Sequence, residues 1–391
     1  MPTELSRVTA RNLYEHFGLQ RRQMLDLARL LVEAESPSGD GEGSRAVVSL
    51  LADAARSIEC VTKVERVAAN VNYGEHLRVT ASGDAASDER SVLLLGHTDT
   101  VHPRGSWRES LWREDDGRIY GPGVFDMKAN CALAVEVLRA CCSLGITPAR
   151  PVVMLLTCDE EAGSFSGRAL VEEEARRAAA VLVLEPPAPG GHAKTERKGT
   201  AGYTVTAHGR AAHAGLEPEK GASAILEMSR QIERLHGLND LARGTTINVG
   251  VVSGGTRSNV VAAEARAEVD VRFTTMSEAQ RIGKVVGELQ PFDERVRLTI
   301  EGEINRPPLE RTEAVMSLYS HARRVAAALD FELRETSVGG ASDGNFAAAI
   351  GAAVLDGLGI DGGGAHADHE HIIVDDVARR GALLAGLIAT L

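Results

Sequence analysis

Residues 92–99, Val-Leu-Leu-Leu-Gly-His-Thr-Asp, place a short apolar run directly before a histidine and an aspartate. The arrangement recurs at residues 152–161, where an apolar run leads through Cys158 into Asp-Glu-Glu, and at residues 181–185, which end in glutamate. Short apolar runs without alternation are typical of strands buried on both faces of a parallel sheet. Polar residues that follow such strands gather at the edge where open α/β folds bind their ligands.

Helical segments alternate with these strands. A fourth apolar run occupies residues 352–355 and precedes a glycine-rich loop that reaches His366. Helical periodicity is found at residues 20–32, 43–58, 128–144 and 166–177. This order predicts an α/β fold, with a mostly parallel sheet flanked by helices.

The middle of the chain predicts an inserted domain of a different kind. Its segments are a strand at 200–208, a helix at 221–235, strands at 245–252 and 262–273, a helix at 278–289 and a strand at 296–301. The order β-α-β-β-α-β is that of a ferredoxin-like α+β domain. We therefore expect residues 197–305 to form a second domain, and residues 1–196 and 306–391 to form the first.

Composition and charge argue against several kinds of partner. The net charge of −12 over 391 residues argues against nucleic acid, because binding it needs a basic surface. No apolar stretch is long enough for a membrane span, and the first residues do not resemble a signal peptide, so neither is expected. Five cysteines without metal-finger spacing are typical of reduced thiols. A cytoplasmic location, with no nucleic acid and no membrane as partner, is expected.

The residues at the strand ends are of the types that bind zinc. Asp126 follows a Gly-Pro-Gly-Val-Phe turn and would join Glu160, Glu161 and Glu185 in one cleft. So many carboxylates would take up protons unless cations separate them, and two divalent ions would do so. Imidazole and carboxylate ligands favour zinc, with cobalt and manganese as alternatives. The candidate ligands are His97, Asp126, Glu161, Glu185 and His366.

At these residues the sequence resembles the co-catalytic zinc aminoacylase and carboxypeptidase family. That family includes acetylornithine deacetylase, succinyl-diaminopimelate desuccinylase and glutamate carboxypeptidase, and the glutamate-carboxypeptidase-like branch is the most similar. The resemblance covers nearly the whole chain. The segments that carry it are residues 96–101, 121–128, 159–164, 202–215 and 339–345.

The resemblance implies a role for each residue of the metal site. His97 and Glu185 would hold one ion, Glu161 and His366 would hold the other, and Asp126 would bridge the two. Asp99 would accept the second N–H of His97 and fix its tautomer. Glu160 would be the general base that takes a proton from a metal-bridging water and passes it to the leaving nitrogen.

The resemblance also assigns the inserted domain to specificity and dimerisation. His213 would reach the active site of a partner subunit and stabilise the oxyanion, so that a homodimer is expected. Asn259 and Arg272 would hold a carboxylate of the substrate, for which the planar fork of arginine is suited. Gly340 would line the substrate site.

The function implied is hydrolysis of an amide bond beside a free carboxylate in a small molecule or short peptide. A glutamate-carboxypeptidase-like enzyme or an N-acyl-amino-acid amidohydrolase is favoured by analogy with the family. A deacylase, a dipeptidase or a ureido-acid amidohydrolase shares this chemistry and stays an alternative. A non-catalytic binding homologue, and a structural protein whose acidic residues are merely solvated, are alternatives of other classes; the second predicts no bound metal.

Overall fold

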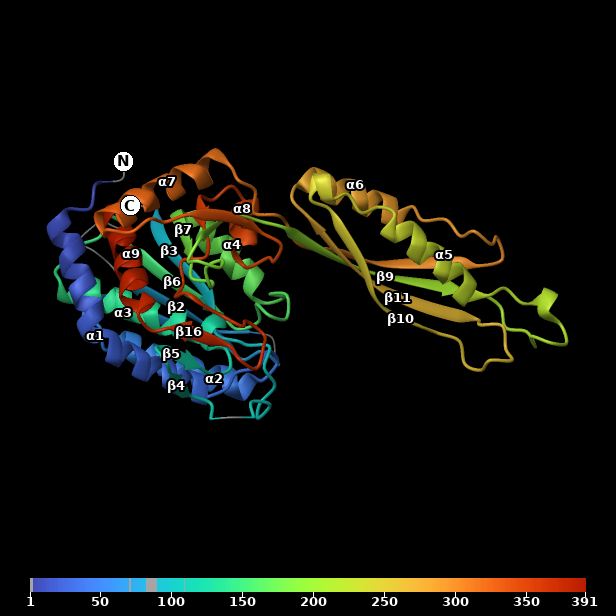
Figure 1. Cartoon of the computed structure of the whole chain (residues 1–391), viewed down its shortest axis with the longest axis horizontal. Coiled ribbons are helices and arrows are strands. Elements are labelled where there is room, and N and C mark those ends of the chain that lie inside the picture. Colours follow the sequence, from blue (N-terminus) through green and yellow to red (C-terminus); the bar gives the residue numbers. More distant parts are fainter. Residues whose placement is uncertain (1–2, 70–71, 82–89, 109) are drawn as a thin grey trace. The chain divides into compact units, whose positions relative to one another are not determined.

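The computed structural model describes residues 3–69, 72–81, 90–108 and 110–391. These residues form two compact units (Figure 1), each with its own hydrophobic core. The first unit contains the chain up to Thr195, together with Arg311–Val338 and Ser342–Leu391. The second unit contains Glu196–Glu310 and Gly339–Ala341. Among the described residues, none of the helices is both long and apolar enough to cross a membrane.

The first unit is built around a sheet to which the described residues contribute six strands. In spatial order these are β1 (Val61–Ala68), β2 (Glu75–Ala81), β6 (Val152–Thr157), β3 (Ser91–His97), β7 (Ala178–Val183) and β14 (Val354–Leu355). Strands β6, β3, β7 and β14 are parallel, and β2 runs antiparallel to β1 and β6. Every residue of β3 and β6 is buried, which explains why both segments are apolar. The mostly parallel sheet that the sequence predicts is confirmed.

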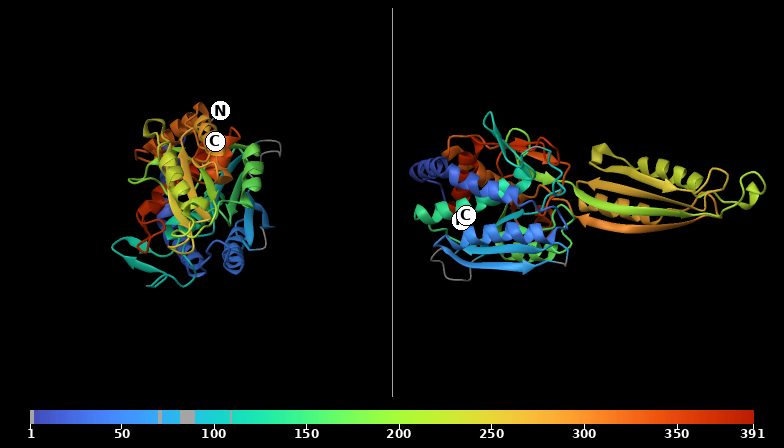
Figure 2. Two further views of the ribbon diagram at one scale, coloured as in Figure 1. Left: turned by 90° about the vertical axis from the view of Figure 1, so that its right-hand side faces the viewer. Right: turned by 90° about the horizontal axis from the view of Figure 1, so that it is seen from below.

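Helices cover both faces of this sheet (Figures 1 and 2). The helices on the face with the larger core are α1 (Arg7–Glu33), α2 (Gly41–Arg56), α3 (Ala129–Ser143) and α9 (Asp376–Thr390). On the other face lie α4 (Gly167–Arg177) and α8 (Gly344–Ala349), while α7 (Glu313–Ala328) packs against α9 and β14. Helices α1 and α9 approach closely where the ring of Phe17 lies over Gly381, since a Cβ at Gly381 would lie 2.3 Å from that ring.

Short strands complete the first unit. A small sheet contains β15 (Gly362–Gly363), β16 (His371–Ile373), β5 (Arg118–Tyr120) and β4 (Arg113–Asp115). Strand β16 contacts the helical turn η1 (Val124–Lys128), which precedes α3. Strand β8 (Ala193–Arg197) pairs with β13 (Glu335–Val338).

The second unit is an antiparallel sheet with helices on one face (Figure 1). Its strands, in spatial order, are β10 (Thr246–Gly254), β11 (Glu264–Phe273), β9 (Gly199–His208) and β12 (Arg297–Arg306). The helices are α5 (Ala224–His236) and α6 (Met276–Gly287), and the short turns are η2 (Pro218–Lys220) and η3 (Leu241–Arg243). Buried and outward-facing residues alternate along β11, because its buried side chains lie under the helices. The chain order of these elements is the β-α-β-β-α-β order that the sequence predicts.

Several elements were not predicted from the sequence. Strands β1 and β2, at one edge of the first sheet, and helices α7 and α9 had no counterpart among the expected segments. Helix α1 begins at Arg7, whereas periodicity indicated a start near residue 20. Helix α9 is buried nearly all round, so it lacks the polar face by which an amphipathic helix is found in a sequence.

Candidate metal centre

Two histidines face opposite oxygens of one carboxylate in the first unit. Nε2 of His97 lies 3.1 Å from Oδ1 of Asp126 and 3.3 Å from Oε1 of Glu185. Nε2 of His366 lies 3.4 Å from Oδ2 of Asp126 and 3.2 Å from Oε1 of Glu161. The structure therefore brings the five candidate ligands together as two sets that share Asp126.

The sheet explains how distant residues meet here. His97 is the last residue of β3, and Glu161 and Glu185 follow the ends of the parallel strands β6 and β7. Asp126 lies in η1, and His366 lies in the loop between β15 and β16. The carboxyl ends of parallel strands share one edge of a sheet, so short extensions suffice to bring their side chains into contact.

The orientation of His97 fits a metal ligand. Its Nδ1 lies 3.0 Å from the main-chain carbonyl oxygen of Asp99. A carbonyl only accepts hydrogen bonds, so Nδ1 carries the proton and Nε2 of the neutral ring presents a lone pair. This lone pair faces oxygens of Asp126 and Glu185, which are also acceptors. Acceptors facing one another need a proton or a cation between them.

The electrostatics of the site lead to the same conclusion. Hydrogen bonds with Asp126 and then Glu161 raise the pKa of His366 to about 10. Burial opposes the charged form of His97, but the carboxylates around it outweigh that effect and raise its pKa well above the usual value. Burial raises the pKa of Glu161, and the nearby carboxylate of Asp126 also raises it, whereas His366 lowers it. The surroundings thus favour positive charge between these side chains, and the residues present fit a pair of divalent ions.

Asp99 holds the segment that carries Glu160 and Glu161. Its Oδ1 accepts the main-chain N–H of Glu160 at 3.1 Å, and its Oδ2 accepts that of Glu161 at 3.1 Å and the hydroxyl of Ser38 at 2.5 Å. The sequence reasoning expected the carboxylate of Asp99 to accept the N–H of His97. In the structure Nδ1 of His97 faces both acceptors of Asp99, the carbonyl oxygen at 3.0 Å and the carboxylate Oδ1 at 3.5 Å.

Other buried polar residues around the site were missed by sequence reasoning. Oδ1 of Asn130 accepts the N–H of Ile360 at 2.8 Å, and its amide group donates to the carbonyl of Phe125. Asp343 accepts hydrogen bonds from the hydroxyls of Thr157 and Ser164. The glycine-rich segment 339–345 had drawn attention to the region of Asp343, but nothing in the local sequence indicates these partners.

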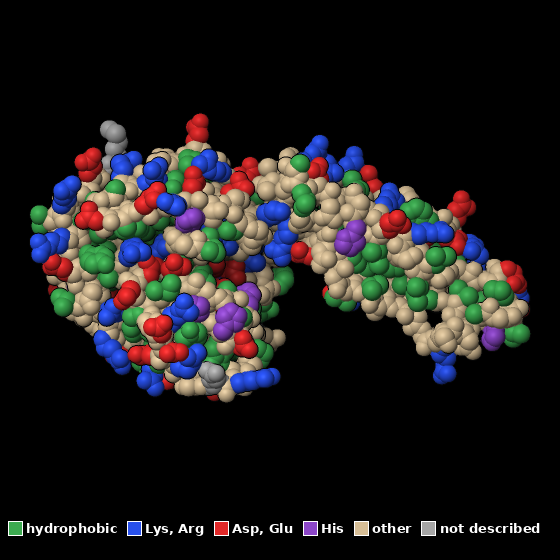
Figure 3. All heavy atoms as spheres, viewed as in Figure 1, with side chains coloured by type: hydrophobic (Ala, Val, Ile, Leu, Met, Phe, Trp, Pro, Cys, Tyr) green, Lys and Arg blue, Asp and Glu red, His purple; other side chains and the backbone are tan. Residues whose placement is uncertain are grey.

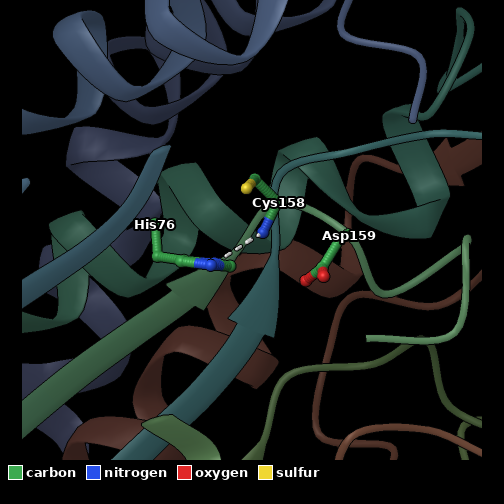
Figure 4. A group of neighbouring side chains, drawn as sticks. All are labelled: His76, Cys158 and Asp159. Atoms are coloured by element: carbon green, nitrogen blue, oxygen red, sulfur yellow. Dashed lines mark hydrogen bonds between the residues drawn. The ribbon is translucent and has the colours of Figure 1, made fainter. Parts of the chain in front are cut away.

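A second group of possible ligands, His76, Cys158 and Asp159, is already satisfied by the protein (Figure 4). Nδ1 of His76 accepts the main-chain N–H of Cys158 at 3.2 Å, and Nε2 lies 3.0 Å from the hydroxyl of Ser166. Asp159 accepts main-chain hydrogen bonds from Ser166 and Gly167 at the start of α4. Because both ring nitrogens are in use, we assign this group a structural role.

The second unit contains His213 and Asn259 as neighbours. The carbonyl of Asn259 accepts the main-chain N–H of Ala214 at 3.0 Å. Nδ1 of His213 accepts the N–H groups of Gly215 and Leu216, both at 3.1 Å. An Nδ1 that accepts leaves the proton of the neutral ring on Nε2, so exposed His213 presents an N–H donor.

Arg272 lies at the other end of this unit's sheet. It is opposite Thr200 and Thr246, whereas Asn259 lies beyond Glu264, at the far end of β11. The eight residue steps from Glu264 to Arg272 span about 25 Å, so Arg272 and Asn259 of one chain cannot grip the same carboxylate. Nε of Arg272 donates a hydrogen bond to Asp270 at 2.9 Å. Gly340, the other residue expected at the substrate site, accepts a hydrogen bond from Arg197 through its carbonyl oxygen at 3.3 Å.

Comparisons with known proteins match most of the chain. Residues 93–390 match the model of Peptidase family M20/M25/M40. The chain is 29% identical over 373 residues to carboxypeptidase G2 of Pseudomonas sp. (strain RS-16), covering 92% of this chain and 87% of that protein. It is 29% identical over 335 residues to acetylornithine deacetylase of Myxococcus xanthus, covering 80% of this chain and 83% of that protein.

Solved structures show the same fold. A tripeptidase from Staphylococcus aureus superposes with a TM-score of 0.76 at 21% identity, covering 94% of this chain and 98% of that one. An M20 family metallo-carboxypeptidase from Sulfolobus solfataricus superposes with a TM-score of 0.70 at 15% identity, with the same coverage.

Proposed function

We propose, since the chain belongs to Peptidase family M20/M25/M40, that it is a two-metal enzyme which hydrolyses an amide bond beside a free carboxylate. That it is an enzyme, a metal-dependent hydrolase, follows from the family. What we propose beyond the family is the kind of bond that is cleaved and the class of substrate. The observation that carries it is the division of the two Asp126 oxygens between His97 and His366.

Different residues of the site would bind the metal ions, transfer the proton and position the base. His97, Asp126 and Glu185 would hold one divalent ion, and Glu161, Asp126 and His366 the other; we propose zinc, with cobalt and manganese able to replace it. Bound ions of this kind lower the pKa of water and polarise the amide carbonyl. Glu160 takes the proton of the attacking water and gives it to the leaving nitrogen. Asp99 fixes the main chain of Glu160, so that its carboxylate is held on a rigid support.

We propose that the active enzyme is a homodimer whose subunits complete each other's sites. Asn259 and Arg272 of one chain are too far apart to share a carboxylate, but residues of two chains can meet at one site. We assign Arg272 to its own chain's substrate, and His213 and Asn259 to the partner's. The terminal nitrogens of Arg272 would bind the substrate carboxylate, because its bond to Asp270 uses Nε. Nε2–H of His213 would stabilise the oxyanion.

Exposed features of the second unit support association. Strand β10 is at the edge of its sheet, and an edge strand offers unpaired main-chain groups to another chain. Val251 and Val252 on this strand are 55% and 60% exposed, and Ile225 and Leu226 on α5 are 48% and 54% exposed. Hydrophobic side chains are also visible on this unit's surface in Figure 3. Such groups on a soluble protein are typical of an interface.

The experiment that tests the proposal is a hydrolysis screen of the zinc-loaded protein. N-acyl amino acids, including acyl-glutamates, and dipeptides are offered, and release of the free amino acid is measured. We expect turnover of substrates with a free carboxylate and little turnover of the matched carboxyl amides. Preference for the amides would contradict the role of Arg272, and turnover unaffected by Glu160→Gln would contradict the mechanism. Selectivity within the screen separates a carboxypeptidase from a deacylase, a dipeptidase or a ureido-acid amidohydrolase.

A further inference from the structure

A buried glutamate outside the ligand set holds the turn that carries Asp126. Glu370 is 0% exposed. Its Oε1 accepts the main-chain N–H groups of Phe125 and Asp126, both at 2.9 Å. Its Oε2 accepts the N–H of Gly123 at 3.1 Å and that of Nε2 of His102 at 2.6 Å. One carboxylate therefore receives three main-chain hydrogen bonds and one from an imidazole.

These contacts are specific to a carboxylate. All four partners donate, so the acceptor must offer several lone pairs and no proton, which an ionised carboxylate does. An amide in its place would present an N–H₂ group to one pair of donors. The ring of His102 is itself held edge-on against Trp107, with ring centroids 5.4 Å apart.

The same glutamate also fixes the loop of His366. Glu370 follows His366 by four residues, and its N–H donates to the carbonyl of Ala367 at 3.2 Å. Its own carbonyl accepts the N–H of Gly121 at 3.2 Å. His366 has a φ of 65°, a conformation that residues other than glycine adopt only where the surroundings hold it. Glu370 thus joins the segment of Asp126 to the segment of His366.

We propose that Glu370, assisted by His102, is a positioning residue that sets Asp126 between the two metal ions. This inference rests on the proposed function, because it requires that Asp126 bridges two ions. Glu370 is not among the proposed metal ligands. It acts through the main chain of residues 123–126, by holding the N–H of Asp126 itself. Its loss lets the shared carboxylate move and weakens the binding of both ions.

The experiment measures metal binding by the full-length protein. Wild type, Glu370→Gln and His102→Leu are equilibrated at graded free zinc concentrations, and bound zinc per chain is determined. We expect Glu370→Gln to need 10-fold to 100-fold more free zinc for half occupancy, the loss typical of removing a partner that orients a metal ligand. For His102→Leu, which removes one of the four hydrogen-bond donors to Glu370, we expect the free zinc concentration at half occupancy to rise roughly threefold to tenfold. The visible spectrum of the cobalt-loaded variant should change, and kcat should fall more than KM rises.

The matched control is Asp368→Asn, whose side chain lies in the same loop and is 99% exposed; it should bind zinc like wild type. Wild-type zinc affinity and an unchanged cobalt spectrum in folded Glu370→Gln would overturn the inference. If Glu370→Gln does not fold, the test rests on His102→Leu. Wild-type zinc affinity in His102→Leu would then overturn the inference. A wild-type protein that binds no metal would refute the proposed function, and this inference with it. Two bound ions in wild type with no effect of either variant would refute only the inference.

Discussion

The carboxylate of Asp99 accepts the main-chain N–H of Glu160 at 3.1 Å, although the two residues belong to different strand ends. Its other oxygen accepts the N–H of Glu161. One buried side chain thereby fixes both the candidate base and a candidate ligand relative to the segment that carries His97. The position of the base depends on this contact between neighbouring strands as well as on the residue's own strand.

Replacing Asp99 should therefore impair catalysis more than substrate binding. In Asp99→Asn an amide group faces one of the two main-chain donors, so the segment of Glu160 and Glu161 shifts. We expect kcat to fall roughly 10-fold to 100-fold, the range for losing a group that orients a metal ligand. Ser38→Ala removes only the hydroxyl that donates to Asp99 and should cost less. Steady-state kinetics with zinc analysis checks this, and equal kcat values for Asp99→Asn and wild type would contradict it.

Glu160→Gln should abolish most turnover without releasing metal. The amide cannot take a proton from water, and general-base catalysis contributes about 10²-fold to 10⁴-fold to a rate. Glu160 is not among the proposed ligands, so bound zinc per chain should stay at the wild-type value. Kinetics and elemental analysis on the same preparation separate the two effects. Full-speed turnover by the zinc-saturated variant would remove Glu160 from the mechanism.

Mixed dimers should recover activity that neither parent has. A dimer of one His213→Ala chain and one Glu160→Ala chain contains one site with an intact Glu160 and an intact partner histidine. Random exchange makes half of the dimers mixed, so about a quarter of wild-type activity should return. Mass spectrometry of tagged chains verifies the exchange. Complete exchange without recovered activity would show that each chain builds its site alone.

Removal of metal should destabilise the first unit. Chelation leaves the carboxylates of Asp126, Glu161 and Glu185 facing histidine nitrogens without a cation, and a ligand at 1,000 times its Kd stabilises the folded state by about 4 kcal/mol. We expect the melting temperature to fall on treatment with a chelator and to return when zinc is added. A melting temperature that does not respond to either treatment would argue against a metal site here.

Alkaline pH should expose the buried thiols. Burial raises the pKa of Cys131 and Cys141 to about 12, whereas an unfolded thiol has a pKa of about 8.5. The folded pKa is the higher one, so this stabilisation is present below pH about 8.5 and is lost as pH rises towards 12. We expect the urea midpoint to fall between pH 8 and pH 10, and both thiols to react slowly with a disulfide reagent until urea unfolds the chain. Rapid labelling of the folded protein at pH 8 would contradict this.

Local sequence determined a large part of this protein. The apolar segments that became β3, β6 and β7 could be recognised because strands buried on both faces are mostly apolar. Polar residues at the ends of parallel strands meet at one sheet edge. The same logic indicated His97, Glu161 and Glu185 as a group. The β-α-β-β-α-β order of the second unit was likewise readable from its periodicity.

Tertiary structure decided what depends on contacts between distant segments. Helix α9 has no polar face that would distinguish it locally, whereas the buried positions of α7 recur at helical spacing and were overlooked. Three relations in space are the hydrogen bond from Glu160 to Asp99, the hydrogen bond from Asp126 to Glu370, and the distance between Asn259 and Arg272 at opposite ends of β11. The residues of the second pair are 244 positions apart in the sequence. Hydrogen bonds of this kind depend on atoms that come within about 3 Å only after the sheet has formed. The sequence therefore indicated the candidate ligands, while the folded chain determined what holds these residues in place.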